Sequence, residues 1–105
     1  MKVATPYSFQ TEEALRTIGA GIRTARLRRG ESTALAAQRT GVTRNTWARL
    51  EDGSPGVATG LLIEALLVYG FDRQVFALAS PEADELGNRL DRQRLPKKGT
   101  SRAKV

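Results

Sequence analysis

The chain has 105 residues and a formal net charge of +6, which limits it to one modest domain with tails and favours a polyanionic partner such as nucleic acid. It contains no cysteine and no histidine, which excludes a disulfide framework, a thiolate metal site and most nucleophilic dyads. We therefore expect a non-enzymatic protein without catalytic residues, metal or cofactor.

The start of the chain lacks the charged region and following apolar run of a secretory signal. The longest apolar stretch, Leu61 to Tyr69, is interrupted by Glu64 and is too short to span a bilayer. We expect a cytoplasmic protein with no membrane partner.

Positive charge is concentrated in two segments. Residues 23–49 contain seven arginines against one acid, and residues 89–105 contain seven basic residues against one acid, while the remaining segments are net acidic. Such basic segments are typical of nucleic-acid binding. The end of the chain, 96–105, is expected to be a disordered basic tail that serves either as a DNA-contacting arm or as a solvated tail.

The first half of the chain predicts three helices. Residues 1–10 are expected to be irregular, and Thr11 is expected to cap a first helix that stops at Gly30. Apolar positions of this helix recur at helical spacing, at Leu15, Ile18, Ile22 and Ala25. Two short helices follow, over 33–40 after Ser32 and over 44–51 after Thr43.

The turn between these two short helices contains Gly41. A short turn with a glycine lets two helices cross, so that the second can lie in the major groove of DNA. Trp47 and Leu50 give this second helix an apolar side that would anchor it to the core.

The second half predicts three more helices after a turn over 52–56. Thr59 would cap the fourth, Asp72 the short fifth, and Ser80-Pro81-Glu82 would start the sixth. The expected inward residues of the fourth are Leu62, Ile63, Leu66 and Tyr69. The pattern favours an all-α fold, a compact bundle of five to six helices that contains a helix-turn-helix. The expected organisation is an irregular segment 1–10, a helix-turn-helix domain 11–79, a C-terminal helix 80–95 and the tail.

The stretch from Arg26 to Gly53 resembles the Cro/lambda-repressor-like helix-turn-helix family, often called XRE-type. The matching residues are Arg26-Leu27-Arg28-Arg29-Gly30, Ala37, Gly41-Val42-Thr43, Trp47, Leu50-Glu51 and Gly53. The resemblance spans about residues 15–78 and implies a lambda-repressor-like DNA-binding domain.

The resemblance also implies roles for individual residues. Arg44, Asn45 and Arg49 match base-reading positions, and arginine pairs with guanine as asparagine pairs with adenine. Phosphate or secondary contacts are expected from Thr33, Arg39, Thr43, Thr46, Arg28 and Arg29. Arg28, Arg29 and Arg39 fit a solvated helix surface equally well. Arg26 and Glu51 are expected to form a structural ion pair.

Three residues depart from the family pattern. Thr33 stands where the family usually has glutamine, Glu31 where an apolar residue is usual, and Ala36 where leucine is usual. Trp47, bulkier than the usual aliphatic residue, would fill the space that Ala36 leaves. These three departures are compatible with weaker DNA binding than is usual in the family.

The part after Gly53 resembles the HipB-like regulators. The residues that carry this resemblance are Asp52-Gly53-Ser54-Pro55-Gly56-Val57, Leu62, Leu66, Gly70-Phe71, Phe76-Ala77-Leu78 and Arg92-Gln93-Arg94-Leu95-Pro96-Lys97-Lys98. It implies an antitoxin that represses its own operon and binds a HipA-like serine/threonine kinase.

Two functions are therefore weighed. The first is a repressor that binds double-stranded DNA at a palindromic operator as a homodimer; the second is an antitoxin-type interaction module that masks a HipA-like kinase, with autoregulatory DNA binding. Apolar residues expected either at a dimer interface or in the core are Leu61, Leu67, Phe71, Phe76 and Leu86.

Overall fold

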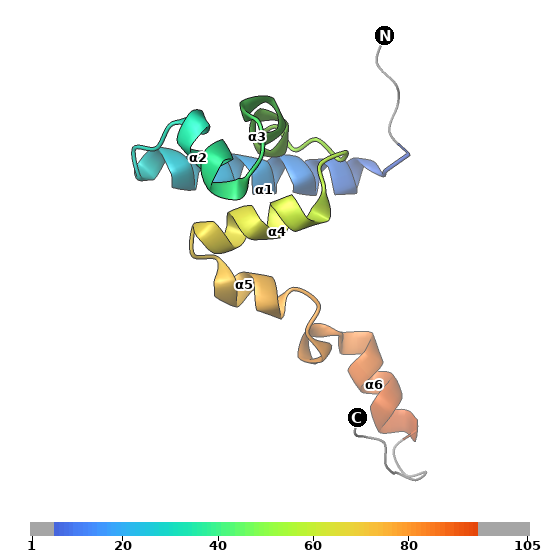
Figure 1. Ribbon diagram of the computed structural model, residues 1–105. Coiled ribbons are helices and arrows are strands. Elements are labelled where there is room, and N and C mark those ends of the chain that lie inside the picture. Colours follow the sequence, from blue (N-terminus) through green and yellow to red (C-terminus); the bar gives the residue numbers. More distant parts are fainter. Residues whose placement is uncertain (1–5, 95–105) are drawn as a thin grey trace. The chain divides into compact units, whose positions relative to one another are not determined.

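The computed structural model describes residues 6–94, and over that range every regular element is a helix (Figure 1). The elements are α1 (Phe9–Arg28), α2 (Thr33–Thr40), α3 (Arg44–Glu51), α4 (Thr59–Val68), α5 (Asp72–Ala77), a 3-10 turn (Pro81–Ala83) and α6 (Glu85–Arg94). The predicted all-α fold class is confirmed. The predicted tail 96–105 lies outside the described residues.

The chain divides into two compact units, one ending at Asp72 and the other beginning at Arg73. In the first unit α3 packs against both α1 and α2, and α2 also contacts α4 (Figure 1). The core between these helices is built from Ile22, Ala25, Ala36, Ala37, Trp47, Leu50, Leu61, Ala65 and Tyr69. Trp47 and Ile22 have no exposed surface, and Trp47 lies in the same cluster as Ala36.

Hydroxyl side chains begin the three helices of the first half. Ser8 caps α1 by accepting a hydrogen bond from the Thr11 amide at 3.1 Å, so the prediction that Thr11 is the cap was wrong. The helix starts three residues earlier, within the segment 1–10 that was expected to be irregular, because Ser8 already satisfies the Thr11 amide. Ser32 and Thr43 cap α2 and α3 as predicted, each accepting from the amide three residues on.

The contact between α1 and α3 runs through Gly19. A Cβ at this position would lie 2.5 Å from the Glu51 carbonyl oxygen and 2.7 Å from that of Leu50, so only glycine lets the two backbones approach this closely. Ile18 was expected to face inward, but it is 36% exposed, because the neighbouring Gly19 is the residue of α1 that lies against α3.

The buried side of α4 differs from the predicted one. Tyr69 is buried as predicted, but the other buried residues are Leu61 and Ala65, whereas the predicted Leu62, Ile63 and Leu66 are half-buried. The helix is apolar on almost every side, so its sequence pattern does not fix which side faces the core. Its N-cap is Ala58, without a side-chain bond, and Thr59 is the first helical residue rather than the predicted cap.

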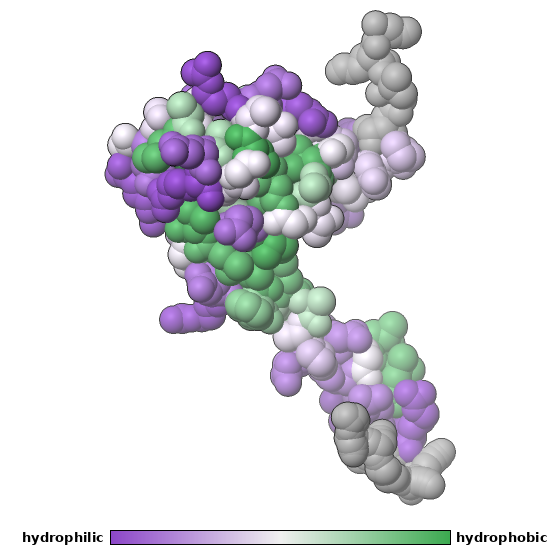
Figure 2. All heavy atoms as spheres, viewed as in Figure 1, coloured by the Kyte–Doolittle hydropathy of each residue, from purple (hydrophilic) through white to green (hydrophobic). Residues whose placement is uncertain are grey.

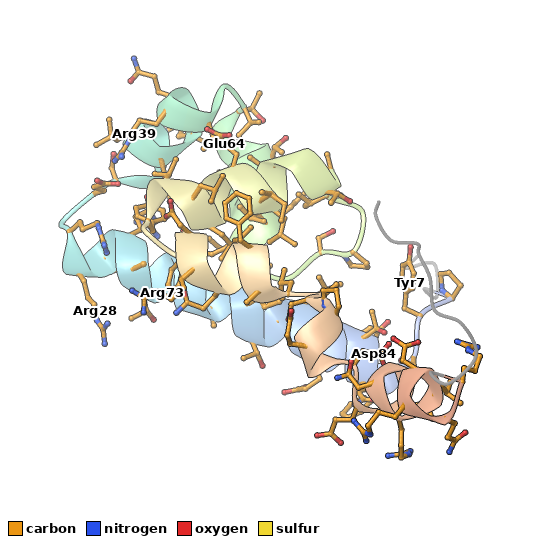
Figure 3. All side chains as sticks on the ribbon, turned by 90° about the horizontal axis from the view of Figure 1, so that it is seen from below. Tyr7, Arg28, Arg39, Glu64, Arg73 and Asp84 are labelled. Atoms are coloured by element: carbon orange, nitrogen blue, oxygen red, sulfur yellow. The ribbon has the colours of Figure 1, made fainter. Side chains whose placement is uncertain are left out.

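The second unit is described from residue 73 to residue 94. The sixth helix was expected to start at Ser80-Pro81-Glu82, but Pro81–Ala83 form a separate 3-10 turn. Asp84 then begins α6, because its carboxylate accepts from the Gly87 amide at 2.9 Å (Figure 3). No residue of this unit is buried within the described range.

Gly19→Ala should destabilise the protein by at least about 1–3 kcal/mol, because the added methyl group meets backbone atoms that cannot move aside. Gly21→Ala is the matched control on the same helix, since a Cβ there meets nothing within 4 Å. This control should be neutral or stabilising by up to about 1 kcal/mol. Urea unfolding followed by circular dichroism measures both, and equal stability of the two variants would contradict the close α1–α3 contact.

Candidate nucleic-acid interface

The turn from Gly41 to Thr43 joins α2 to α3. Gly41 adopts a left-handed conformation (φ +73°), which side chains other than glycine rarely adopt. The Val42 amide bonds to the Ala37 carbonyl at 3.0 Å, which closes the end of α2. Because Thr43 then caps α3, only three residues separate the end of α2 from the start of α3.

The outer side of α3 carries the predicted base-reading residues. Arg44, Asn45 and Arg49 are all exposed, and the side chains of Arg44 and Asn45 make no hydrogen bond or ion pair with any described residue. Arg49 donates to the Ser54 hydroxyl at 3.3 Å. Figure 2 shows hydrophilic residues gathered over the α2 and α3 side of the first unit.

The inner side of α3 is fixed by a buried ion pair. Arg26 donates to the Glu51 carboxylate from Nε at 2.7 Å and from Nη2 at 3.0 Å, and the Trp47 indole donates to it at 2.6 Å. Both charged side chains are under 10% exposed. The hydrogen bond with Glu51 raises the pKa of Arg26 above its ordinary value. The expected pair between α1 and α3 is therefore present, and it includes the indole as a third member.

A second cluster, called here the Tyr69 cluster, consists of Glu31, Tyr69, Arg29 and Arg39. The Tyr69 hydroxyl donates to Glu31 at 2.8 Å, and Arg39 donates to the other carboxylate oxygen at 2.5 Å. The Arg29 and Arg39 guanidinium groups lie 5.3 Å and 6.0 Å from the centre of the Tyr69 ring. Arg29 also donates to the Ala25 carbonyl at 2.9 Å. Two arginines predicted to contact phosphate thus make contacts within the protein, although both remain exposed.

The cluster changes the proton affinity of its members. The Tyr69 hydrogen bond, together with Arg39, lowers the pKa of Glu31 below its ordinary value. Burial, followed by the bond to Glu31, raises the pKa of Tyr69 from 10.0 to about 12. Sequence reasoning missed this cluster, although one signal was present: Glu31 occupies a position where the family usually has an apolar residue.

The other predicted secondary contacts lie around α2 and α3. Arg28 is exposed and extends away from the end of α1 (Figure 3). Thr33 is the first residue of α2 and is half-buried. The Thr43 and Thr46 side chains bond to each other at 3.1 Å.

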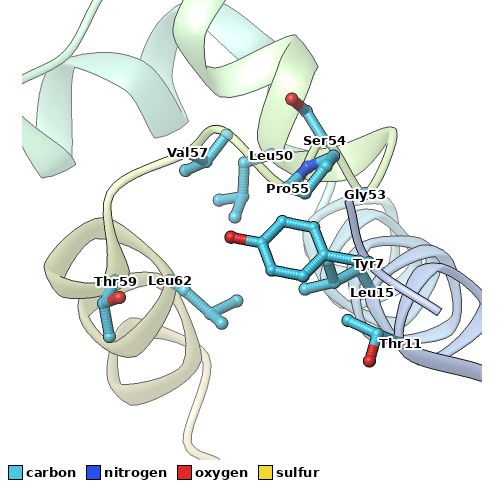
Figure 4. A pocket seen from close by; sticks show the side chains of 10 residues that line it. All are labelled: Tyr7, Thr11, Leu15, Leu50, Gly53, Ser54, Pro55, Val57, Thr59 and Leu62. Carbon is cyan, nitrogen blue, oxygen red and sulfur yellow. The ribbon is translucent and has the colours of Figure 1, made fainter. Parts of the chain in front are cut away.

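A small pocket of about 180 Å³ lies between the start of α1, the loop after α3 and α4 (Figure 4). Leu15, Leu50 and Leu62 form part of its apolar lining, and none of its lining residues is charged. Ser54, the hydrogen-bond partner of Arg49, is also at its wall. The pocket therefore adjoins the loop that positions Arg49.

The described residues contain no group of three or more acidic side chains placed to hold a metal ion. None of the described helices is long and apolar enough to cross a membrane.

The helices α2 and α3 are joined by a three-residue turn, and α3 has an apolar side in the core and a polar side outside. This arrangement defines a helix-turn-helix DNA-binding domain. The comparison with known families agrees, because a family model described as a helix-turn-helix domain matches residues 17–79. The chain belongs to this family. No curated protein and no solved structure gives a significant match.

Glu51→Gln should destabilise the protein by about 3–5 kcal/mol, because it leaves the buried Arg26 charge unpaired. Glu64→Gln, at an exposed position on α4, is the control and should stay within about 0.5 kcal/mol of the unchanged protein. Urea unfolding measures both variants. A loss of under 1 kcal/mol for Glu51→Gln would show that the ion pair does not hold α1 and α3 together.

The Tyr69 cluster predicts a loss of stability in alkali. The raised pKa means that the folded state holds the Tyr69 proton more tightly than the unfolded state does. The resulting stability is complete below pH 10 and is lost as the pH rises through about 12. Tyr69→Phe should therefore lose less stability than the unchanged protein between these pH values. Unfolding measured across this pH range tests the assignment, and equal pH slopes for Tyr69→Phe and the unchanged protein would contradict it.

Proposed function

We propose that the protein is a sequence-specific transcriptional regulator of the XRE type, a cytoplasmic repressor that binds a palindromic operator as a homodimer. The observation that carries this proposal is the two-sided character of α3. Arg44 and Asn45 are exposed and without partners among the described residues, while Trp47 and Leu50 bury the opposite side. A base-reading helix needs both features.

The chemistry of the exposed side favours reading base edges in the major groove. Arg44 can pair bidentately with guanine and Asn45 with adenine, and Arg49 is one helical turn further on. Thr33, Thr43, Thr46 and Arg28 would supply phosphate or secondary contacts. Arg29 and Arg39 would have to leave the Tyr69 cluster to reach DNA, so we assign them a structural role first.

A homodimer would place two copies of α3 on the two halves of a symmetric operator. Of the apolar residues weighed for an interface, Leu61 is in the core, and Leu67 and Phe71 are half-buried. Phe76 and Leu86 are exposed. The domain boundaries proposed from the sequence, 11–79 for DNA binding and 80–95 for the C-terminal helix, place Leu86 outside the DNA-binding part.

A second candidate function is the HipB-like one, in which the chain masks a HipA-like kinase. The exposure of Phe76 (80%) and Leu78 (68%) favours it, because a large apolar surface fits a protein partner. Co-expression with a kinase encoded beside its gene tests it. Stable co-purification with loss of kinase activity supports the candidate, and full kinase activity in the presence of excess chain contradicts it.

Arg44→Ala should weaken binding to the protein's own promoter by about 1–3 kcal/mol and relax one base preference. Arg23→Ala removes the same charge from an exposed position on α1 and is the control. Mobility-shift titrations over a range of salt concentrations measure both, and binding of the unchanged protein should weaken steeply with salt. Equal affinity for promoter and random DNA would contradict sequence-specific repression.

A further inference from the structure

We infer that α6 is a self-pairing helix that docks antiparallel on α6 of a second copy of this chain. The inference rests on the proposed homodimer and names the surface that forms it. Three observations within residues 73–94 carry it: an uncovered apolar stripe, an unequal distribution of charge along the helix, and the near symmetry of the stripe about one residue.

The apolar stripe of α6 consists of Leu86 and Leu90, which are 56% and 42% exposed. Residues four apart lie on one side of a helix, and Figure 2 shows hydrophobic residues gathered on one side of this segment. The helix has no buried residue and is otherwise strongly polar. Such a helix gains little stability from packing within its own unit, so a partner that covers its apolar side would stabilise it.

The distribution of charge along the segment favours a second copy of this chain as the partner, in the antiparallel direction. Residues 82–85 are acidic, with Glu82, Asp84 and Glu85, and residues 89–94 are net basic, with Arg89, Arg92 and Arg94 against Asp91. An antiparallel copy places each acidic end beside a basic end, whereas a parallel copy would place like charges together. The ion pair of Arg94 with Asp91 is long, at 3.5 Å, and both side chains are mostly exposed, so it leaves Arg94 able to turn to another acid.

The stripe also fits a twofold axis. Leu86 and Leu90 are each two residues from Asn88, so a twofold axis through the stripe, midway between the leucines, sets each leucine against the other leucine of the copy. A twofold interface requires such self-complementarity. Two leucines cover less area than the roughly 1,200 Å² at the low end of specific interfaces. The association through α6 is therefore weak and dependent on concentration.

Cysteine cross-linking tests both the pairing and its direction, because the full chain contains no cysteine of its own. Ala83 and Gln93 are each five residues from Asn88 and both are exposed; Ala83 ends the 3-10 turn before α6, and Gln93 lies near the end of α6. An antiparallel pair brings residue 83 of one copy to residue 93 of the other. Under mild oxidation without DNA, a mixture of Ala83→Cys and Gln93→Cys chains should form a disulfide-linked dimer, and each variant alone should form none.

Two further substitutions serve as tests of the stripe. Adding Leu90→Glu to both chains should abolish the mixed disulfide, because it places a charge on the apolar contact. Leu27→Glu changes a leucine of similar exposure on α1 and should leave cross-linking unchanged. Circular dichroism checks that all variants fold, so loss of helix is distinguished from loss of pairing.

Some outcomes would overturn the inference. Disulfides within each single variant would indicate a parallel pair, and absence of the mixed disulfide at high protein concentration would assign the stripe to a different protein. Promoter binding is measured separately with the cysteine-free chain. Specific DNA binding without the mixed disulfide rejects only the α6 pairing, whereas the mixed disulfide without specific DNA binding rejects only the proposed regulator.

Discussion

The buried carboxylate of Glu51 is the feature on which the candidate DNA-binding surface depends. It accepts two hydrogen bonds from Arg26 of α1 and one from Trp47 of its own helix. Because a buried charge that loses its partner costs several kcal/mol, α3 cannot rotate without breaking this arrangement. Gly19 brings the two backbones close enough for it to form. The direction in which Arg44 and Asn45 point is therefore set from the inside of the protein.

The Tyr69 cluster shows that charge counted along a sequence differs from charge available to a partner. The segment 23–49 holds seven arginines, yet Arg26 is buried against Glu51, and Arg29 and Arg39 pack on Tyr69. The number of phosphate contacts available from this segment is therefore smaller than its seven arginines suggest, because Arg26 at least is buried. Arg29, which follows α1, contacts Tyr69 at the end of α4, and Arg39, in the last turn of α2, pairs with Glu31.

The two units carry separate parts of the proposed activity. The first presents a recognition helix, and the second presents an amphipathic helix with complementary ends. Reading a symmetric operator needs two copies of the first, and α6 offers a way to join them. A weak association through α6 would be strengthened on DNA, because two copies held on adjacent half-sites have a high effective concentration for each other.

The sequence by itself determined the helical fold class, the positions of α2 and α3 with their caps at Ser32 and Thr43, and the glycine turn between them. These features depend on local chemistry: a hydroxyl bonds an amide three residues away, and glycine tolerates a left-handed conformation. The pairing of Arg26 with Glu51 also followed from the sequence, through its resemblance to a family rather than through spacing.

Only the tertiary structure decided the contacts between distant segments. The core-facing side of α4 depends on which of its many apolar residues meets the other helices, and the sequence of an evenly apolar helix does not specify this. The pairing of Glu31 with Tyr69, 38 residues away, likewise follows from the packing of α4 against the rest of the first unit. Local pattern fixes where helices begin and end, whereas long-range packing determines which of their side chains become buried, paired or left free for a partner.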